Sequence, residues 1–127
     1  MKEIRLSRLE LQIMDVLWGR EEASIREIQE SFPEVNRPAY ATVQTTVYRL
    51  ETKKALRRTR KVGNFHIFSA IVSRQVTQYR MLEDLLALFG GQSRPVMSHL
   101  IEAGKLTLDD VEFAEKTLKS LQRKGQK

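Results

Sequence analysis

Apolar residues recur every three or four positions along much of the chain, and this spacing predicts amphipathic helices separated by short breaks. The first two helices each open with a capping-box sequence, Ser7-Arg8-Leu9-Glu10 and Ser24-Ile25-Arg26-Glu27, in which a hydroxyl and a carboxylate cap each other's backbone amide. We expect the first helix to end near Gly19 and the second around Pro33. The apolar positions that these helices would bury are Leu9, Ile13, Val16, Leu17, Ile25, Ile28 and Phe32.

A third helix is predicted over residues 39–53, and its two faces differ in kind. Val43, Val47 and Leu50 fall within one narrow sector at about 100° per residue and point toward a core. The opposite face carries Thr, Gln, Tyr and Arg, where a solvent-facing helix would carry Glu and Lys. Hydroxyl and amide groups suit base edges and phosphates, so this face is predicted to enter a DNA major groove. Its DNA-binding residues would be Tyr40, Ala41, Thr42, Gln44, Thr45, Tyr48 and Arg49.

A strongly basic segment follows this helix directly. Residues 53–61 hold six cations and no acid, so the segment alone has a net charge of +6, which equals the formal net charge of the entire chain. The turn Val62-Gly63-Asn64 and the β-prone sequence Phe65-His66-Ile67-Phe68 come next and predict a basic β-hairpin, or wing. Cations on such a hairpin can neutralise backbone phosphates and release counterions. The expected phosphate contacts are Lys53, Arg58, Arg60, Lys61 and Asn64.

The order helix, helix, helix, hairpin is that of a winged helix-turn-helix domain, in which the third helix enters the major groove. We therefore predict a mainly α fold with a small β-hairpin, whose DNA-binding domain spans residues 1–72. A total length of 127 residues leaves room for one appended element.

The remaining residues, 73–127, predict three more amphipathic helices. The first ends at Gly90-Gly91, the second begins near Pro95, and the third opens with Thr107-Leu108-Asp109-Asp110, an N-cap followed by acids that favour the helix dipole. These helices have little core of their own to cover, so we expect a dimerisation region that packs against a second copy of the chain. Packing back onto the same chain is the alternative. The expected interface residues are Val76, Tyr79, Leu82, Leu86, Phe89, Leu100, Val111, Leu118 and Leu121.

Composition narrows the function further. The absence of cysteine excludes a disulfide framework, a thiolate nucleophile and a cysteine-based metal site. The sequence pI of about 9.8 fits nucleic acid or an anionic membrane as partner. No apolar run approaches the roughly 18 residues of a membrane span, and the N-terminus is too charged for a signal peptide. We expect a cytoplasmic protein without membrane insertion.

The sequence predicts neither catalysis nor a metal or cofactor site. His66 and His99 lie far apart, and neither has a Cys, His or Glu at ligand spacing. Capping explains Asp109 and Asp110 better than acid–base catalysis does. Gly90-Gly91 lacks the Lys-Ser/Thr that completes a phosphate loop and is more simply a helix terminator.

Three ordered motifs span nearly the whole chain. They are Leu9-Glu10 with Ile13-Met14-Asp15-Val16-Leu17-Trp18, Tyr40-Ala41-Thr42-Val43-Gln44-Thr45 with Arg49-Leu50, and Gly90-Gly91. Together they resemble the penicillinase-repressor family, which contains winged-helix repressors of beta-lactamase and methicillin-resistance genes and related copper-responsive repressors. The resemblance implies a homodimer that blocks transcription from an inverted-repeat operator, often with TACA and TGTA half-sites.

The resemblance also implies ways of releasing the DNA. In the beta-lactamase branch, a membrane metalloprotease sensor leads to cleavage of the repressor between an Asn and a Phe of its dimerisation region. Counting from Gly90-Gly91, Ser98 and His99 occupy those positions, which departs from the family's pair and leaves the cleavage site open. The copper-responsive branch uses a cysteine-rich C-terminal motif, so sensing of that type is excluded here.

Three functions follow from these patterns. The leading one is a dimeric repressor that binds a specific operator in double-stranded DNA. The alternative is a winged-helix interaction module whose basic surface docks an acidic protein. The third is a nuclease, which would need acids clustered near the basic surface, whereas the acids here are scattered among helix starts and faces.

Overall fold

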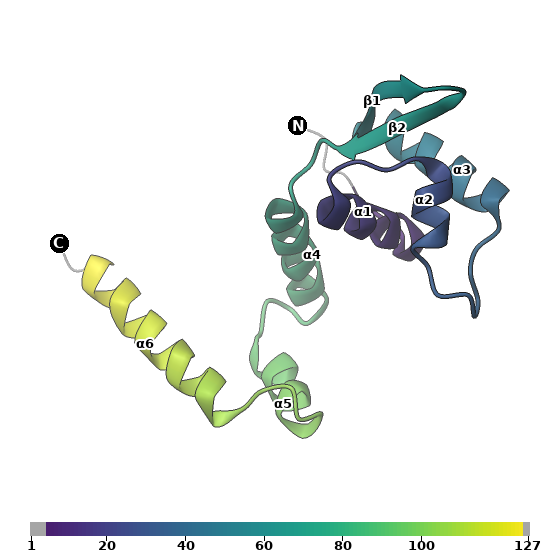
Figure 1. Ribbon diagram of the computed structural model, residues 1–127. Helices are drawn as coiled ribbons and strands as arrows, with labels where there is room; N and C mark the ends of the chain where they lie inside the picture. The colour runs from purple at the N-terminus through teal and green to yellow at the C-terminus, as the bar shows by residue number, and fades with distance from the viewer. Residues whose placement is uncertain (1–4, 126–127) are drawn as a thin grey trace. The chain divides into compact units, whose positions relative to one another are not determined.

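Six helices and one β-hairpin make up the computed structural model over residues 5–125, the part of the chain that it describes (Figure 1). The hairpin packs against α1 and α3, and α2 packs against α3. This arrangement confirms the predicted winged helix-turn-helix fold, mainly α with a small β-hairpin. In chain order the elements are α1 (Arg8–Arg20), α2 (Ile25–Glu30), α3 (Tyr40–Thr52), β1 (Leu56–Val62), β2 (Phe65–Ala70), α4 (Arg74–Leu88), α5 (Arg94–Glu102) and α6 (Leu108–Gly125).

Both predicted capping boxes form. Glu10 accepts a hydrogen bond from the Ser7 backbone N–H at 2.8 Å, and the Glu10 N–H donates to the Ser7 hydroxyl at 3.3 Å. The same reciprocal pair joins Ser24 and Glu27, at 2.9 and 3.2 Å. These bonds satisfy N–H groups that a helix start leaves unpaired, and so they fix where α1 and α2 begin.

The end of α2 differs from the expectation. This helix stops at Glu30, so Phe32 lies beyond it, although Phe32 still packs against the hydrophobic core. Pro33 disfavours helical backbone at the residue before it, which explains why Phe32 does not continue the helix.

One hydrophobic core joins α1, α2 and α3 to the hairpin. Val43, Val47 and Leu50, the residues of α3 predicted to point inward, are fully buried. Trp18 packs against this core, and its indole N–H donates to the Val72 carbonyl oxygen at 3.0 Å. The other buried members of the core are Ile13, Met14, Leu17, Ala23, Ile25, Ile28, Ala55, Leu56 and Phe68.

The wing is an antiparallel hairpin with one irregularity. Arg58 pairs with Phe68 and Arg60 pairs with Ile67, so Thr59 is an extra residue that forms a β-bulge. On the other side of β2, Ala23 exchanges two backbone hydrogen bonds with Phe68, at 3.0 and 2.9 Å. The linker between α1 and α2 therefore anchors the wing.

The chain divides into two compact units after residue 80. The first turns of α4 belong to the first unit, where Arg74 lies 3.3 Å from a carboxylate oxygen of Asp15 and stacks over the Trp18 ring at 5.7 Å. The domain boundary expected between residues 72 and 73 falls directly before α4 and stays a prediction.

The three C-terminal helices form where the sequence predicts them. After α4, Gly90 and Gly91 have φ values of 66° and 79°, a left-handed conformation that favours glycine and ends the helix. Before α6, the Thr107 hydroxyl accepts a hydrogen bond from the Asp110 N–H, and the Asp110 carboxylate accepts one from the Thr107 N–H. None of the side chains of α4, α5 or α6 is buried.

Residues 5–125 contain neither a membrane-spanning helix nor a candidate metal site. No helix in this part of the chain is both long and apolar enough to span a membrane. The same residues contain no cluster of three or more His, Cys, Asp or Glu side chains arranged to hold a metal ion.

Candidate nucleic-acid interface

The exposed face of α3 carries the side chains that the sequence predicts for DNA contact. Six of the seven predicted residues are exposed, and the seventh, Gln44, is half-buried. The helix begins after Ala39 without a side-chain cap, so its first N–H groups remain available for a phosphate oxygen. The six exposed residues are Tyr40, Ala41, Thr42, Thr45, Tyr48 and Arg49.

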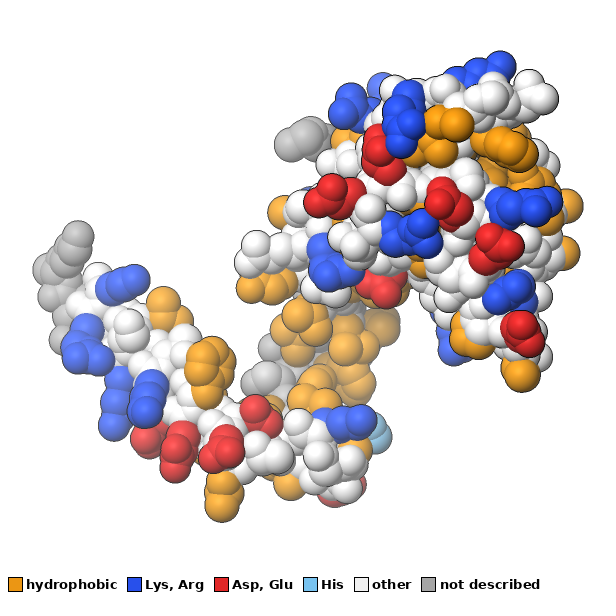
Figure 2. All heavy atoms as spheres, viewed as in Figure 1, with side chains coloured by type: hydrophobic (Ala, Val, Ile, Leu, Met, Phe, Trp, Pro, Cys, Tyr) orange, Lys and Arg blue, Asp and Glu red, His pale blue; other side chains and the backbone are white. Residues whose placement is uncertain are grey.

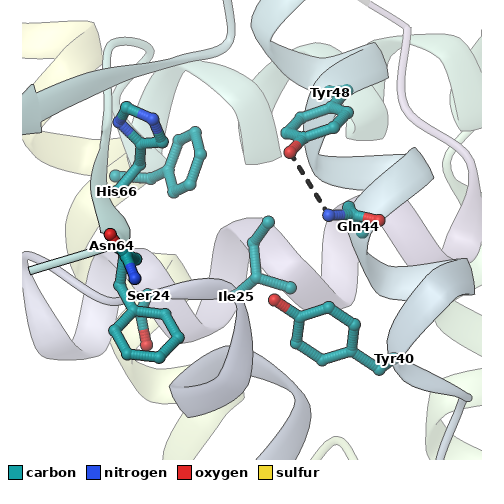
Figure 3. Close-up of a pocket in the computed structure, with 9 residues that line it drawn as sticks. Ser24, Ile25, Tyr40, Gln44, Tyr48, Asn64 and His66 are labelled. Carbon is teal, nitrogen blue, oxygen red and sulfur yellow. Dashed lines mark hydrogen bonds between the residues drawn. The ribbon is translucent and has the colours of Figure 1, made fainter. Parts of the chain in front are cut away.

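A shallow groove separates this face of α3 from the wing (Figure 3). Tyr40, Gln44 and Tyr48 line it from α3, and Asn64 and His66 line it from the hairpin. Its volume of about 100 Å³ is well below the roughly 300–1,000 Å³ of ligand pockets. The groove therefore does not fit a small-molecule site, and it brings side chains from both predicted DNA-binding elements together.

A connected set of contacts joins the wing to α3 beside this groove. The Gln44 amide nitrogen donates to the Tyr48 hydroxyl at 3.3 Å. The guanidinium of Arg58 stacks over the rings of Tyr48, at 5.4 Å, and Phe68, at 5.6 Å. Glu51 accepts two hydrogen bonds from Arg58, at 2.8 and 3.3 Å. Arg58, predicted to contact phosphate, is thus also held by three side chains of its own chain, those of Tyr48, Phe68 and Glu51.

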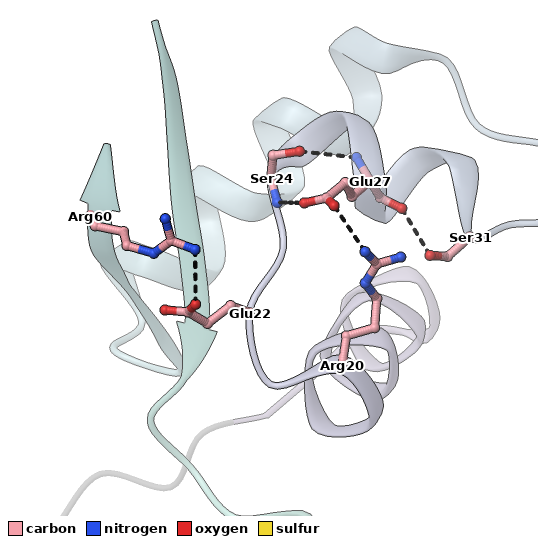
Figure 4. Close-up of polar contacts among 6 residues, drawn as sticks. All are labelled: Arg20, Glu22, Ser24, Glu27, Ser31 and Arg60. Atoms are coloured by element: carbon pink, nitrogen blue, oxygen red, sulfur yellow. Dashed lines mark hydrogen bonds and ion pairs between the residues drawn. The ribbon is translucent and has the colours of Figure 1, made fainter. Parts of the chain in front are cut away.

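Two other predicted phosphate contacts have carboxylate partners. The Lys53 ammonium lies 2.8 Å from each carboxylate oxygen of Glu10 and 2.9 Å from the Arg5 carbonyl oxygen. Arg60 lies 3.3 Å from Glu22, whose other carboxylate oxygen accepts a hydrogen bond from the Thr59 hydroxyl at 3.0 Å. Figure 4 shows Arg60 and Glu22 between the wing and the start of α2.

The carboxylates that pair with Lys53 and Arg60 have lowered pKa values. At Glu10, burial raises the pKa, but hydrogen bonds from Lys53 and Ser7 and the positive charge of Lys53 outweigh burial, so the pKa falls below its usual range. At Glu22, the hydrogen bonds from Thr59 and Arg60 lower the pKa. Both groups are therefore ionised at neutral pH and hold their cations.

Three cations of the basic segment have no such partner. Within residues 5–125, no ion pair or hydrogen bond joins the side chains of Lys54, Arg57 or Lys61 to another group. All three are exposed, as is Asn64 at the tip of the hairpin. Figure 2 shows Lys and Arg side chains gathered over the hairpin end of the first unit. Lys54 and Arg57 were not among the predicted contacts, although they belong to the same basic run.

Comparison with known protein families identifies the family of this chain. Residues 6–120 match the model of a family described as penicillinase repressor. The chain belongs to the penicillinase-repressor family. This confirms the family resemblance found in the sequence and makes the chain a winged-helix, DNA-binding transcriptional repressor.

Individual proteins and solved structures are also similar to this chain. A penicillinase repressor of Staphylococcus aureus is 21% identical over 124 residues, which cover 97% of this chain and 98% of that protein. The solution structure of the DNA-binding domain of the repressor BlaI matches with a TM-score of 0.50 and 27% identity, covering 58% of this chain and 90% of that one. A mutant of Lactococcus lactis ZitR matches with a TM-score of 0.51 and 14% identity, covering 99% of this chain and 80% of that one, and has the same fold.

Eight of the nine predicted dimer residues of this repressor lie on α4, α5 and α6, and the ninth, Phe89, directly follows α4. None of the nine is buried within the chain. Leu86 and Leu100 are half-buried, and the other seven are exposed. Phe89 and Leu100 help to line an apolar groove between α4 and α5, together with His99. Ser98 and His99, the predicted cleavage region, lie inside α5.

Proposed function

We propose that this repressor binds an inverted-repeat operator in double-stranded DNA as a homodimer, in the cytoplasm, and blocks transcription there. In each copy α3 would enter the major groove and the wing would lie along the phosphate backbone. The observation that carries the proposal is the exposed Thr-, Gln-, Tyr- and Arg-bearing face of α3, followed by three cations that have no partner within the described residues 5–125.

Base reading is proposed for the central part of the exposed face of α3. Gln44 and Arg49 can each make bidentate contacts with a purine, and Thr45 can meet either a base edge or a thymine methyl group. Tyr40, Ala41, Thr42 and Tyr48 would complete the contact surface. Their exposure and their position on one helix face support this proposal.

Phosphate binding is proposed first for Lys54, Arg57, Lys61 and Asn64, because these side chains can reach a phosphate without leaving a partner. Lys54 has a φ of 66°, a backbone conformation that glycine adopts with less strain. A lysine at this position therefore destabilises the fold by about 1 kcal/mol or more relative to an unstrained residue. The engaged cations Lys53, Arg58 and Arg60 would join them only by exchanging a carboxylate for a phosphate.

Dimerisation is proposed through α4, α5 and α6. A segment of three helices that buries none of its side chains lacks a core of its own. Large apolar side chains such as Tyr79, Leu118 and Leu121 are about 60% exposed, which favours burial against a second copy. Two-fold symmetry would place two copies of α3 about one DNA turn apart, as an inverted repeat requires.

Release by proteolysis in the second unit is also proposed, with the membrane sensor protease pathway of the beta-lactamase branch as its model. The Ser98–His99 bond lies inside α5, so a protease would need this helix to open before it could cut there. Cleavage in a turn, such as the segment around Gly90-Gly91, would need no helix to open.

Fluorescence anisotropy tests the proposed operator binding. Duplex DNA from upstream of the repressor's own gene is compared with scrambled DNA at two salt concentrations. We expect roughly a thousandfold preference for the specific duplex and a steep loss of affinity with salt. Arg49→Ala should weaken binding to the specific duplex well beyond its effect on scrambled DNA, whereas Arg123→Ala on α6 should change neither. Weak, salt-insensitive binding to every DNA tested, by a protein that still dimerises, would contradict the proposal and favour an acidic protein partner.

A further inference from the structure

Gln44 and Tyr48 form a hydrogen-bonded pair on α3, and the groups of Gln44 left free by this bond match the hydrogen-bonding edge of one base. We infer that Tyr48 is a positioning residue that orients the Gln44 amide to read an adenine in the major groove. The inference rests on the proposed function, because it assumes that α3 enters that groove. It concerns specificity at a single base pair, so it can fail while operator binding stands.

The amide of Gln44 has a donor and an acceptor that match adenine. Adenine presents the N7 acceptor and the N6 amino donor in the major groove, and a glutamine amide pairs with both through one N–H and its oxygen. The second N–H of the amide donates to the Tyr48 hydroxyl at 3.3 Å. Within residues 5–125, Gln44 Oε1 accepts no hydrogen bond, so the adenine-facing acceptor is unoccupied.

The same orientation works against guanine. Guanine presents two acceptors, O6 and N7, on its major-groove edge. With the amide nitrogen turned toward Tyr48, Gln44 Oε1 would face an acceptor of guanine instead of a donor. Reading guanine would require the amide to turn over, with the hydrogen bond reversed so that the Tyr48 hydroxyl donates to Gln44 Oε1.

Tyr48 is itself held by the wing, which makes it suited to fixing another side chain. The guanidinium of Arg58 stacks on the Tyr48 ring, and Arg58 also donates two hydrogen bonds to the Glu51 carboxylate. Figure 3 shows the Tyr48 hydroxyl directed at the Gln44 amide along the wall of the groove. A preorganised side chain loses less rotamer freedom on binding, and this raises both affinity and discrimination.

The chain contains a matched pair without this support. On α4, the Gln75 amide donates to the Tyr79 hydroxyl at the same spacing of four residues and the same distance of 3.3 Å. Among the described residues, no arginine stacks on Tyr79. The pair on α4 therefore provides a control for a glutamine–tyrosine bond that is not next to a wing.

The test begins with selection of binding sites from random duplex DNA by the wild-type protein. Affinities are then measured for the selected duplex and for versions with each other base pair at one position of one half-site. We expect one position at which an A·T pair is preferred by about 5- to 150-fold, the range for a bidentate contact. Gln44→Ala should remove this preference, and Gln75→Ala should leave it unchanged.

Two further measurements separate orientation from mere packing. Replacing that adenine by 7-deazaadenine removes N7, and it should weaken binding of the wild type while having little effect on Gln44→Ala. Tyr48→Phe keeps the ring that stacks on Arg58 but lacks the hydroxyl, so it should reduce the A·T preference by about 2- to 10-fold. Its melting temperature should stay near that of the wild type.

The outcomes test separately the proposed operator binding, the reading of adenine by Gln44 and the positioning role of Tyr48. Failure to select any site would contradict the proposed function itself. A selected site whose preferences are the same in wild type and Gln44→Ala would overturn the reading of adenine by Gln44, as would a guanine at the position that Gln44 controls. An unchanged preference in Tyr48→Phe would remove the positioning role of Tyr48.

Discussion

Replacing Glu10 by glutamine tests whether the buried capping box ties α1 to the end of the DNA-binding helix. The Glu10 side chain is 2% exposed, caps α1 through Ser7 and contacts the ammonium of Lys53, the residue that follows α3. Glutamine keeps the size of the side chain and an oxygen for the Ser7 N–H. It removes the charge and places an amide N–H₂ group beside the Lys53 ammonium, where two donors would meet.

The size of the effect follows from the exposure of the two partners. A hydrogen bond to a charged group contributes about 1.5–3 kcal/mol, and the lower end applies because the Lys53 side chain is 34% exposed and can turn to water. We therefore expect Glu10→Gln to lower the free energy of unfolding by about 1.5 kcal/mol. Glu27 provides the matched control, since it caps α2 in the same way and pairs with Arg20 at the surface, with both side chains more than 40% exposed. Glu27→Gln should cost about 0.5 kcal/mol or less.

Urea unfolding followed by Trp18 fluorescence measures this difference. The chain has one tryptophan, and its indole is bonded to Val72 within the winged unit, so the signal reports on that unit. The protein concentration is held constant because dimerisation would otherwise change the apparent stability. A difference of about 1 kcal/mol between Glu10→Gln and Glu27→Gln corresponds to roughly 0.5 M in the urea midpoint. Equal losses in both variants would refute the claim that burial makes the Glu10 pair stronger.

The pH dependence provides a second check on Glu10. Its pKa is lowered in the folded protein, so its charge stabilises the fold above the pKa of the unfolded chain, and this stabilisation is lost as the pH falls through the folded-state pKa. Wild type and Glu10→Gln should therefore differ at neutral pH and converge in acid. A difference that persists in acid would mean that the ion pair is not its cause.

Three further predictions concern the wing and the dimer. Lys61→Gln should reduce the slope of log affinity against log salt concentration by roughly 1.8 per dimer, since each phosphate contact contributes about 0.9. Arg60→Gln should reduce this slope less, because Arg60 pairs with Glu22. Equal reductions in the two variants would contradict this prediction. Leu118→Glu on α6 should abolish the dimer in sedimentation velocity while Lys116→Glu leaves it intact, and a dimeric Leu118→Glu would exclude this face of α6 as the interface. Glu22→Gln should make the thermal stability less dependent on pH below about 4.5. The pKa of Glu22 is lowered in the folded protein, so the ionised carboxylate stabilises the fold above the unfolded-state pKa, and this stabilisation is lost on acidification. Unchanged pH profiles would contradict this prediction.

The sequence was sufficient for features whose cause is local. The capping boxes at Ser7 and Ser24 join residues three positions apart, and the buried face of α3 follows from helical periodicity alone. The wing was also predictable, because Gly63 and Asn64 provide a turn between two β-prone runs. Each of these signals depends on the backbone within a few residues, so no knowledge of the tertiary structure was needed.

The contacts of the cations could not be predicted in the same way. Lys53 meets Glu10, which lies 43 positions earlier, and Arg60 meets Glu22, which lies 38 positions earlier. These pairs depend on how α1 and its following linker pack against α3 and the wing. The sequence does not distinguish among the six cations of the basic segment. In the fold, three of them are held by carboxylates, namely Lys53, Arg58 and Arg60, and three are unheld, namely Lys54, Arg57 and Lys61. The partner of Arg58 was closer, seven positions away, but its stack on Tyr48 again depends on the hairpin folding back toward α3.

In the proposed complex, the paired and unpaired cations of the basic segment would contribute differently to affinity and to specificity. If Arg58 or Arg60 moved to a phosphate, it would leave a carboxylate unpaired close to DNA, and the resulting repulsion would offset much of the gain. The unheld cations Lys54, Arg57 and Lys61 meet no such opposition, so they should account for most of the salt dependence. The held Arg58 instead stabilises Tyr48 and, through it, the Gln44 amide. Neutralising an unheld cation should therefore weaken binding to all DNA alike, whereas disturbing Arg58 should lower the ratio of specific to non-specific affinity.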